Sequence, residues 1–310
     1  MNDRIVRAEA ILRASCGDRL RTGYSMASLT TFRIGGPAAL YLELESDSDL
    51  AAAGHAALEA DLPVIVVGKG SNLLVSDDGF PGLVLRLGKR FRWAARDGAR
   101  ILAGGAMPLP ALAGIAYRHG LSGLEFGVAI PATLGGATRM NAGAHGHELA
   151  EVLDRIDLFM LREQARVSIP ATTGHFSYRR SDLPDDGVVV GAVVSLRPLD
   201  AQVIRDHMAR AREWRRRTQP LVEPNCGSVF INPAGGHAAV LIERVGAKGR
   251  AVGGASVSTK HANFIVASPG TRAADVAALI REIQDLVESR TGVRLETEVR
   301  LVGEFDRARR

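Results

Sequence analysis

The chain has 310 residues, of which 46% are hydrophobic and 24% charged; this composition is typical of a folded globular protein and excludes a disordered or collagen-like chain. Its formal net charge of +5 suits a small anionic ligand as well as a nucleic acid, so charge does not select the partner. At roughly 100 to 200 residues per domain, the length predicts two domains, or one domain with an added lobe.

Cysteine usage and hydropathy predict where the protein works. Cys16 and Cys226 show no spacing typical of a disulfide framework or a metal site, which favours a reducing compartment. Charged residues interrupt the first 20 positions, so we expect no secretory signal. The longest strongly apolar run, residues 188–196, is far shorter than the roughly 20 residues of a membrane-spanning helix. We therefore expect a cytoplasmic protein without membrane insertion.

Helices and strands are mixed in the first two thirds of the chain, which predicts an α+β fold. An amphipathic helix opens the sequence, with its apolar stripe at Ile5, Ala8, Ile11 and Leu12. A strand at 41–44, a helix begun by Ser46 or Asp47, and a strand at 63–68 follow. Further on we predict one helix near 110–119 and four strands, at 100–104, 154–161, 165–169 and 186–196.

A break at residues 197–199 precedes a second set of elements. The next helix is predicted to bury one stripe, made of Val203, Ile204, His207, Met208, Ala211 and Trp214. A long helix at about 273–290, stopped by Gly292, is predicted to bury Val276, Leu279, Ile280, Ile283, Leu286 and Val287. An alternating strand at 293–303 follows it. We place the main domain boundary at 198/199, with lobes of about 1–90 and 91–198 in the first domain and a second domain at 199–310.

Two glycine-rich segments are candidates for a cofactor site. Residues 123–146 are rich in Gly and Ala, and the N–H groups of its turns, or of a helix starting near Thr133, could hold phosphate oxygens. Close packing of a helix on a sheet explains the same composition equally well. The turn at 66–75 follows a strand but has neither the GxGxxG spacing nor the GK[ST] ending of a P-loop. Alone, it indicates no more than a turn.

Other polar motifs are weaker on their own. The loop 175–183 carries Arg179, which could clamp a carboxylate, although adjacent loop arginines are usually solvated. Cys226 invites a nucleophile hypothesis, but a small buried residue at a turn is the better interpretation because no histidine stands out as its partner.

Strand alternation places Glu296 and Glu298 on one face. The polar run before residue 264 reads as an exposed edge, and the eight histidines form no recognisable metal motif.

Taken in order, several motifs resemble one family. They are TTFRIGGPA (30–38), VGKGSNLLVSD (67–77), GLEFGVAIPATLGGATRMNAGAHG (123–146), SYRRS (177–181), PNCGSVFINP (224–233), KHANFIV (260–266) and LETEVRLVG (295–303). The chain is similar over nearly its whole length to the UDP-N-acetylenolpyruvoylglucosamine reductases of bacterial peptidoglycan precursor synthesis. Its length and the compact link after SYRRS resemble the type II members.

The resemblance implies a two-lobed FAD-binding domain of the vanillyl-alcohol-oxidase type, with a C-terminal α+β domain that closes over the UDP-sugar. It implies a catalytic trio of Arg179, Ser228 and Glu298. The implied substrate contacts are Tyr178, Asn232, Lys260 and Asn263. The implied non-covalent FAD contacts are Thr31, Arg33, Ile34, Gly35, Gly68, Lys69, Gly70, Ser71, Asn72, Leu73, Ile130, Pro131, Gly135, Gly136, Asn141, Ala142 and Gly143.

Three positions depart from the family pattern. Ala132 stands where many members have Gly, Ala267 replaces a usual Asn, and Ile231 stands where a Lys or Arg is common. The last change puts one phosphate or sugar contact in doubt, which Lys260 or a residue of Arg215, Arg216 and Arg217 could replace. None of these changes touches the implied trio.

The implied reaction uses NADPH as co-substrate to reduce FAD, after which hydride goes to the vinyl C3 of the substrate. Arg179 would stabilise charge at C2 and its carboxylate, and Ser228 would protonate C2. Two alternatives stay open. A flavin oxidase of the same fold would react with O₂, and a nucleic-acid-binding module is disfavoured by the 5% aromatic content, since such proteins stack bases on aromatic rings.

Overall fold

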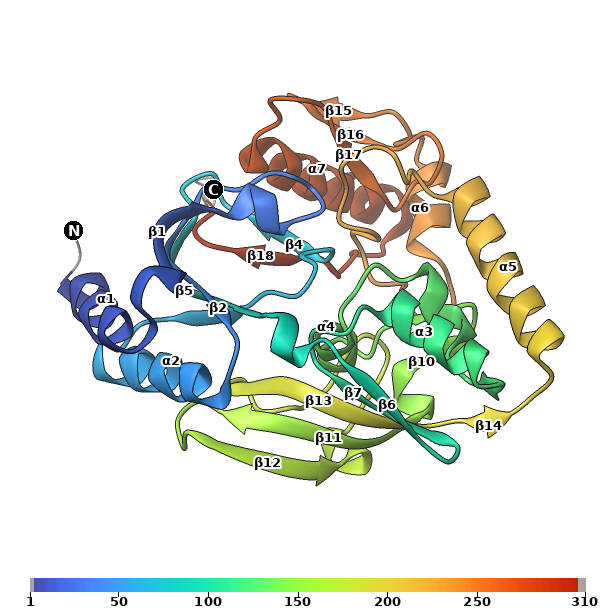
Figure 1. Cartoon of the computed structure of the whole chain (residues 1–310). Helices are drawn as coiled ribbons and strands as arrows, with labels where there is room; N and C mark the ends of the chain where they lie inside the picture. Colours follow the sequence, from blue (N-terminus) through green and yellow to red (C-terminus); the bar gives the residue numbers. More distant parts are fainter. Residues whose placement is uncertain (1–2, 306–310) are drawn as a thin grey trace. The chain divides into compact units, whose positions relative to one another are not determined.

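The computed structural model describes residues 3–305, which form two units built from several stretches of chain each (Figure 1). The first unit comprises residues 1–22, 40–69 and 82–215. The second comprises residues 23–39, 70–81 and 216–310. The chain therefore passes from one unit to the other several times. The domain boundary at 198/199 stays a prediction.

The first unit begins with the predicted amphipathic helix. Helix α1 (Asp3–Cys16) buries Ala8 and Leu12 completely and packs on α2 (Asp47–Glu59). Ser46 caps α2, since its Oγ accepts a hydrogen bond from the Asp49 N–H at 3.2 Å, as the sequence predicted. Both helices share a core with strands β2 (Pro37–Leu44) and β5 (Phe80–Leu87).

Two sheets accompany these helices. The four-stranded sheet has the order β1-β2-β5-β3, where β1 is Leu20–Ser25 and β3 is Val64–Val66, and β3 runs parallel to β5. The five-stranded antiparallel sheet has the order β12-β11-β13-β7-β6. Its strands are β6 (Ala94–Asp97), β7 (Arg100–Gly104), β11 (Leu153–Met160), β12 (Ala165–Pro170) and β13 (Gly187–Ser195). The four strands predicted between residues 100 and 198 are thus confirmed.

Strand β13 is apolar because both of its faces are covered. Val188 and Val190 belong to the core of α1 and α2, whereas Val189 packs with Ile156 and Leu158 of β11. Helix α4 (Leu134–Arg139) contacts the same strand (Figure 1). A strand buried on both sides reads as a continuous hydrophobic run, which explains its sequence.

The remaining elements of the first unit surround a third core cluster. Helix α3 (Leu109–Arg118) matches the helix predicted near 110–119. The short strands are β8 (Leu121–Ser122) paired with β14 (Arg197–Pro198), and β9 (Gly143–Ala144) paired with β10 (His147–Glu148). Helix α5 (Ala201–Thr218) begins in this unit. It buries Ile204, Met208 and Ala211, but His207 is exposed, and Val203 and Trp214 are 39% and 41% exposed. Half of the predicted stripe is therefore wrong, because only one side of the helix is covered.

The second unit is organised around the long predicted helix. Helix α7 (Ala273–Thr291) ends at Gly292, whose φ of 74° is a left-handed C-cap, and its predicted apolar face lies in the core. It packs against α6 (Ala238–Arg244) and against the sheet β15-β16-β17, formed by Ala251–Val252, Ala255–Val257 and Ile265–Ala267. Strand β4 (Leu73–Val75) pairs in parallel with β18 (Arg300–Val302).

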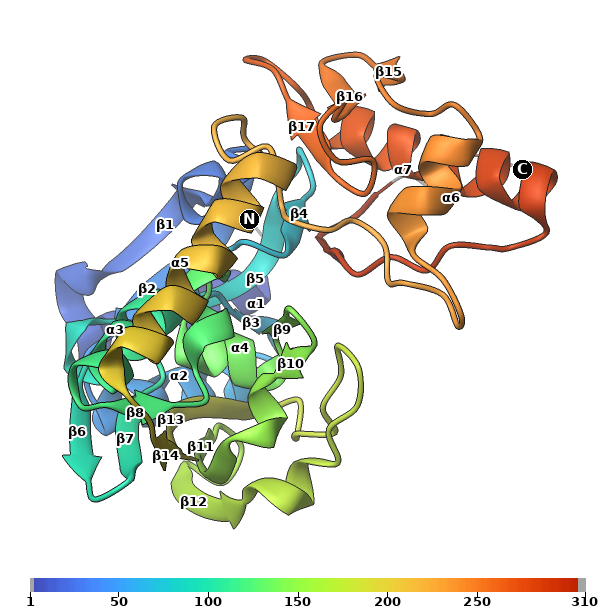
Figure 2. The ribbon, with the colours of Figure 1, turned by 90° about the vertical axis from the view of Figure 1, so that its right-hand side faces the viewer.

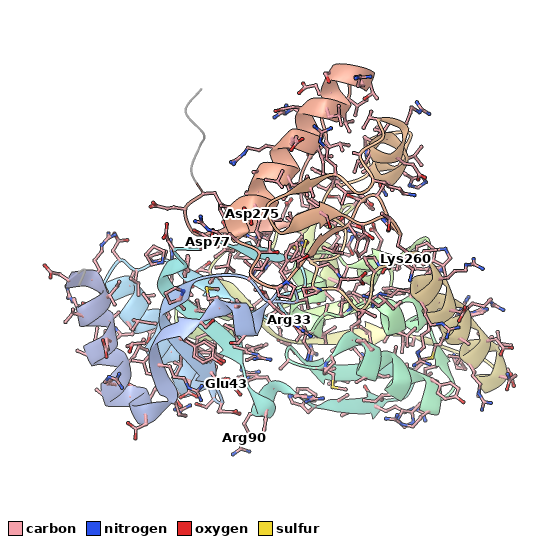
Figure 3. All side chains as sticks on the ribbon, turned by 90° about the horizontal axis from the view of Figure 1, so that it is seen from above. Arg33, Glu43, Asp77, Arg90, Lys260 and Asp275 are labelled. Atoms are coloured by element: carbon pink, nitrogen blue, oxygen red, sulfur yellow. The ribbon has the colours of Figure 1, made fainter. Side chains whose placement is uncertain are left out.

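Two carboxylates fix the N-terminal end of α7 (Figure 3). Asp77 accepts hydrogen bonds from the N–H groups of Ala273 and Ala274 at 2.8 and 3.0 Å, and Asp275 accepts from that of Arg272 at 3.1 Å. Negative groups are favourable here because the first N–H groups of a helix have no partner within it. Asp77 thereby ties residues 70–81 to the C-terminal part of the chain.

The strand predicted over residues 293–303 is largely wrong. Only Arg300–Val302 form β18, and Thr297 makes an isolated bridge. The pairing with β4 is short, so the alternation of the sequence extends beyond the actual strand. The basic tail at 306–310 lies outside the described residues. Within residues 3–305, no helix is both long and apolar enough to cross a membrane.

Candidate active site

The loop at residues 68–72 carries unsatisfied backbone donors. None of its five N–H groups donates a hydrogen bond to any acceptor in the part of the chain that the structure describes. Gly68 lies so close to Thr133 that an added Cβ would be 2.5 Å from the Thr133 Oγ1, so the loop tolerates no side chain there. Clustered free N–H groups are the donor set that binds an anionic phosphate. This loop therefore fits the pyrophosphate of a dinucleotide.

The start of α4 offers no such donors. The N–H groups of Leu134 and Gly135 donate to the carbonyls of Met107 and Gly105, and that of Gly136 donates to the Thr133 Oγ1. The expectation that a helix starting near Thr133 would provide free N–H groups is therefore wrong. The small residues of this block are explained in part by packing, because a Cβ on Gly135 would lie 2.9 Å from the Val189 carbonyl oxygen. The role of Gly135 and Gly136 in cofactor binding stays a prediction, as does that of Ile130 and Pro131.

Asn141 closes the same block with a side chain that is used within the chain. The residue is 1% exposed, and its amide bonds Glu148, Ser177 and Ala150. What Asn141 can offer a cofactor is therefore its main chain. Ala142 and Gly143 follow it and are partly exposed, and their predicted cofactor contacts are not tested by the geometry.

The loop that follows β12 lies close to the hairpin of β9 and β10 (Figure 2). Arg179 belongs to this loop, as predicted from the sequence. Its Nη2 donates to the Gly143 carbonyl oxygen at 2.8 Å, and its guanidinium lies 4.8 Å from the ring centroid of Tyr178. Its φ is 59°, which places a non-glycine residue in the left-handed region. Arg179 is thus held in one place by its neighbours.

In the second unit, residues 30–36 and 70–73 lie close together. Thr31 donates its N–H to the Gly70 carbonyl at 3.2 Å and its hydroxyl to the Asn225 carbonyl at 2.6 Å. Gly70 has a φ of +61° and approaches Leu29 so closely that only glycine fits. The remaining predicted cofactor residues of this unit are Arg33, Ile34, Gly35, Ser71, Asn72 and Leu73, with the exposed side chain of Arg33 marked in Figure 3.

Ser228 follows a turn that two asparagines support. Asn225 accepts a hydrogen bond from the Gly227 N–H at 2.9 Å, which closes a turn before Ser228. Asn263, which is 4% exposed, accepts from the Phe230 N–H and donates to the Phe230 carbonyl, at 2.9 and 2.8 Å. Asn263 was expected at an exposed edge; it is buried because its amide satisfies a backbone segment inside the core.

Glu298 lies beside the same turn. Its N–H donates to the Val229 carbonyl at 2.8 Å, and its own carbonyl accepts from the Asn72 side chain at 3.0 Å. Ser228 and Glu298, 70 positions apart in the sequence, are therefore neighbours along paired backbone segments. Glu296 is exposed whereas Glu298 is half-buried. Neither residue lies within β18, so their predicted place on one strand face stays a prediction.

The Cys226 thiol is unsuited to be a nucleophile. It is 2% exposed, and its burial, followed by the nearby Glu298 carboxylate, raises the pKa of the thiol far above its usual value. The thiolate is the reactive form of cysteine. The interpretation of Cys226 as a small buried residue at a turn is confirmed.

Two of the predicted substrate residues also hold the fold locally. The Asn232 side chain accepts from the Ala238 N–H at 3.0 Å at the start of α6. The Lys260 ammonium donates to the Arg216 carbonyl at 2.7 Å (Figure 3). Arg215, a candidate to replace the basic residue missing at Ile231, donates to the Ala129 carbonyl, and burial lowers the pKa of its guanidinium.

Sequence reasoning missed several residues that position the site. They are the partners of the Arg179 loop, Arg139, Glu148 and Ser177. The helix start near Thr133 was predicted, and Thr133 is the N-cap of α4, but its close approach to Gly68 was not predicted. Except for Glu148, these residues join segments more than 30 positions apart, and no local pattern predicts such pairs.

Comparisons with known proteins identify two domains in this chain. Residues 38–160 match the FAD binding domain, and residues 219–302 match the C-terminal domain of UDP-N-acetylenolpyruvoylglucosamine reductase. The chain is 44% identical over 286 residues to UDP-N-acetylenolpyruvoylglucosamine reductase 2 of Symbiobacterium thermophilum (92% of each chain), and 43% identical over 282 residues to the reductase of Heliobacterium modesticaldum (90% of this chain, 89% of the other).

A solved structure is similar as well. The UDP-N-acetylenolpyruvylglucosamine reductase of Thermus caldophilus matches with a TM-score of 0.81 and 34% identity, over 92% of this chain and 100% of that one. The expected α+β class, with an FAD-binding domain and a C-terminal domain of the reductase type, is confirmed. The chain belongs to the UDP-N-acetylenolpyruvoylglucosamine reductase family and is a flavin-dependent oxidoreductase.

Proposed function

We propose that the protein reduces UDP-N-acetylglucosamine enolpyruvate to UDP-N-acetylmuramate, with NADPH as reductant and non-covalently bound FAD, in peptidoglycan precursor synthesis in the cytoplasm. The observation that carries the proposal is that Ser228 and Glu298, which with Arg179 form the trio that the family resemblance implies, lie on paired backbone segments. The free N–H groups of residues 68–72 support a bound pyrophosphate.

The residues supply what the reaction needs besides the hydride. FAD, when bound, carries a hydride from NADPH to the vinyl C3 of the substrate. The bond that forms at C3 leaves an electron pair at C2, and the Ser228 hydroxyl gives its proton to C2, which completes the addition of H⁻ and H⁺ across the double bond. The Ser228 Oγ has no hydrogen-bond partner among the described residues, so its proton is not committed elsewhere in the chain.

Charge stabilisation falls to the other two members of the trio. The Arg179 guanidinium forms a charge-assisted contact with the substrate carboxylate, whose negative charge grows as C2 becomes enolate-like. Glu298 acts as a hydrogen-bond donor in its protonated form, because an ionised carboxylate would oppose the same charge. Tyr178, Asn232 and Lys260 are the proposed substrate contacts; Asn263, which the resemblance also implied, supports the Ser228 segment from within the core instead.

The test is a two-step spectroscopic experiment on the purified protein. A yellow flavin that is released on denaturation establishes non-covalent FAD. Under anaerobic conditions NADPH should bleach the flavin, and the enolpyruvyl UDP-sugar should restore its colour. Fast recovery in air without the UDP-sugar, together with no response to the UDP-sugar, would show a flavin oxidase instead.

A further inference from the structure

Asn141 is a buried polar residue whose side chain is fully used. Its Nδ2 donates to the Glu148 Oε2 at 2.7 Å and to the Ser177 carbonyl oxygen at 2.9 Å, while its Oδ1 accepts from the Ala150 N–H at 3.0 Å. Its φ is 42°, so its backbone is in the left-handed region. A buried amide that donates two hydrogen bonds and accepts a third fixes the segments that it contacts.

One of those segments is the turn that carries Arg179, residues 177–180. Ser177 and Arg180 exchange two backbone hydrogen bonds of 3.0 Å, and the Ser177 carbonyl therefore accepts both from Arg180 and from Asn141. Arg179 itself has a φ of 59°, a conformation that a non-glycine residue keeps only when its surroundings impose it. The Asn141 bond is part of that constraint.

The segment of Asn141 also supplies the contact at the other end of the Arg179 side chain. Gly143, two residues after Asn141, accepts the 2.8 Å hydrogen bond from the Arg179 Nη2, and Glu148, which accepts from Asn141, pairs with Gly143 in the β9–β10 hairpin. One side chain thus connects the backbone of the Arg179 turn with the backbone that holds the guanidinium.

We propose that Asn141 is the positioning residue of Arg179, and that it sets the orientation of the guanidinium without touching the substrate. The inference rests on the proposed role of Arg179 in the reaction. It explains why Asn141, which lies in a segment with several predicted cofactor contacts, makes its side-chain hydrogen bonds to other parts of the protein. Displacement of a reacting group by about 1 Å costs on the order of 10²-fold in rate, so loss of one fixing bond should be measurable.

The central experiment is a double-variant comparison on the FAD-loaded protein. Asn141→Ala should slow single-turnover reoxidation by the UDP-sugar at least about tenfold and should slow reduction by NADPH by a smaller factor. Arg179 acts only in the second step, and the substitution keeps the main chain that Asn141 can offer the cofactor. If Asn141 acts through Arg179, the variant with both Asn141→Ala and Arg179→Ala should be no slower than Arg179→Ala alone. If the double variant is slower than Arg179→Ala by the same factor by which Asn141→Ala slows the wild type, the inference is overturned.

Asn141→Asp serves as a second variant, because it keeps the volume and the acceptor for Ala150 but loses the donors to Ser177 and to the Glu148 carboxylate. It should show the same selective loss in reoxidation if Asn141→Ala does not fold. Ser122→Ala is the matched control, since Ser122 is 4% exposed and also donates one side-chain hydrogen bond, to Glu125 at 2.6 Å. A control that slows reoxidation as much as Asn141→Ala would show a general structural effect and overturn the inference.

Limited trypsin digestion gives a readout that does not depend on turnover. The turn contains Arg179 and the exposed Arg180, so cleavage there should be faster in Asn141→Ala and Asn141→Asp than in wild type and Ser122→Ala. Unchanged cleavage in both Asn141 variants would overturn the positioning role.

Two outcomes separate failure of this inference from failure of the proposed function. If Arg179→Ala reoxidises like wild type, the proposed role of Arg179 fails and the positioning inference fails with it. If the reduced flavin of the wild type does not respond to the UDP-sugar, the proposed function itself is refuted.

Discussion

The two segments that carry the proposed catalytic side chains are held in different ways. The Arg179 turn in the first unit is an exposed loop fixed by polar side chains, among them Asn141 and the Ser181 hydroxyl, which donates to the Arg139 carbonyl at 2.7 Å. The Ser228 segment in the second unit is held by backbone hydrogen bonds and by the side chains of Asn225 and Asn263, and it continues into a core that contains Val229 and Phe230, each 1% exposed.

This difference has a consequence for substitutions. A loop held by side chains can lose its geometry when one polar group is removed, while its surroundings stay folded. A segment that enters a core is held by many apolar contacts, so its geometry and the stability of the fold change together. Variants of the first segment should therefore affect rate more than stability, and supporting variants of the second should affect stability first.

The largest effect is expected for the reacting group of the second segment. Ser228→Ala should lower UDP-sugar-dependent flavin reoxidation at least about 10²-fold, the low end for loss of a general acid, and leave NADPH-dependent reduction near normal. Cys226→Ala, two residues earlier, is the control because its thiol is buried and protonated. Stopped-flow absorbance measures both half-reactions. A severe loss in Cys226→Ala with an active Ser228→Ala would reverse the assignment.

Removal of a supporting side chain in the second segment should destabilise the protein. Asn263→Ala leaves the buried N–H and carbonyl of Phe230 without partners, which should cost about 2–4 kcal/mol in the free energy of unfolding. Asn232→Ala loses a part-buried bond to the Ala238 N–H and should cost less than half as much. Urea denaturation compares them. Equal losses would mean that burial does not distinguish these two amides.

The proposed protonated donor is the next effect in size. Glu298→Ala should slow reoxidation about tenfold, whereas Glu298→Gln keeps a donor and should retain most of the rate. Glu298→Asp should fall short because its reach is reduced. Glu296→Ala alters an exposed carboxylate and should be mild. Single-turnover reoxidation decides the question: equal damage from the Ala and Gln variants of Glu298 would refute the neutral-donor role, and a severe Glu296→Ala defect would move the site by two residues.

The smallest effect is expected for the pH dependence of stability, through the buried carboxylate of Asp49. Asp49 is 4% exposed, and burial alone would raise its pKa, but its bonds with Arg19 at 2.6 Å and with the Glu45 N–H lower the pKa below its usual value. A depressed folded pKa stabilises the fold above the unfolded value of about 4, and this contribution is lost as pH falls through the folded pKa.

Wild type should therefore lose stability below about pH 4, and Asp49→Asn should show a flatter decline over the same range, although it is less stable at neutral pH. Thermal unfolding from pH 3 to pH 7 measures the difference. Parallel declines of the two proteins would show that the Asp49 carboxylate makes no contribution to the acid sensitivity.

The sequence by itself determined the elements with strong local signals. The period of apolar residues and the caps at Ser46 and Gly292 predicted α2 and α7, and β-branched runs predicted strands such as β13. The ordered motifs were sufficient to indicate the family, because a motif is read directly from neighbouring residues. These features depend on interactions over a few positions, which the local sequence contains.

Only the tertiary structure decided how distant segments support the candidate site. The extent of the strand predicted at 293–303 depended on the length of its partner β4. The burial of Asn263 depended on the backbone of Phe230, 33 positions away. The engagement of the N–H groups at the start of α4 by Met107 and Gly105 was likewise not visible in the motif. Hydrogen bonds across such separations form only when the chain is folded, and for that reason the sequence alone does not specify them.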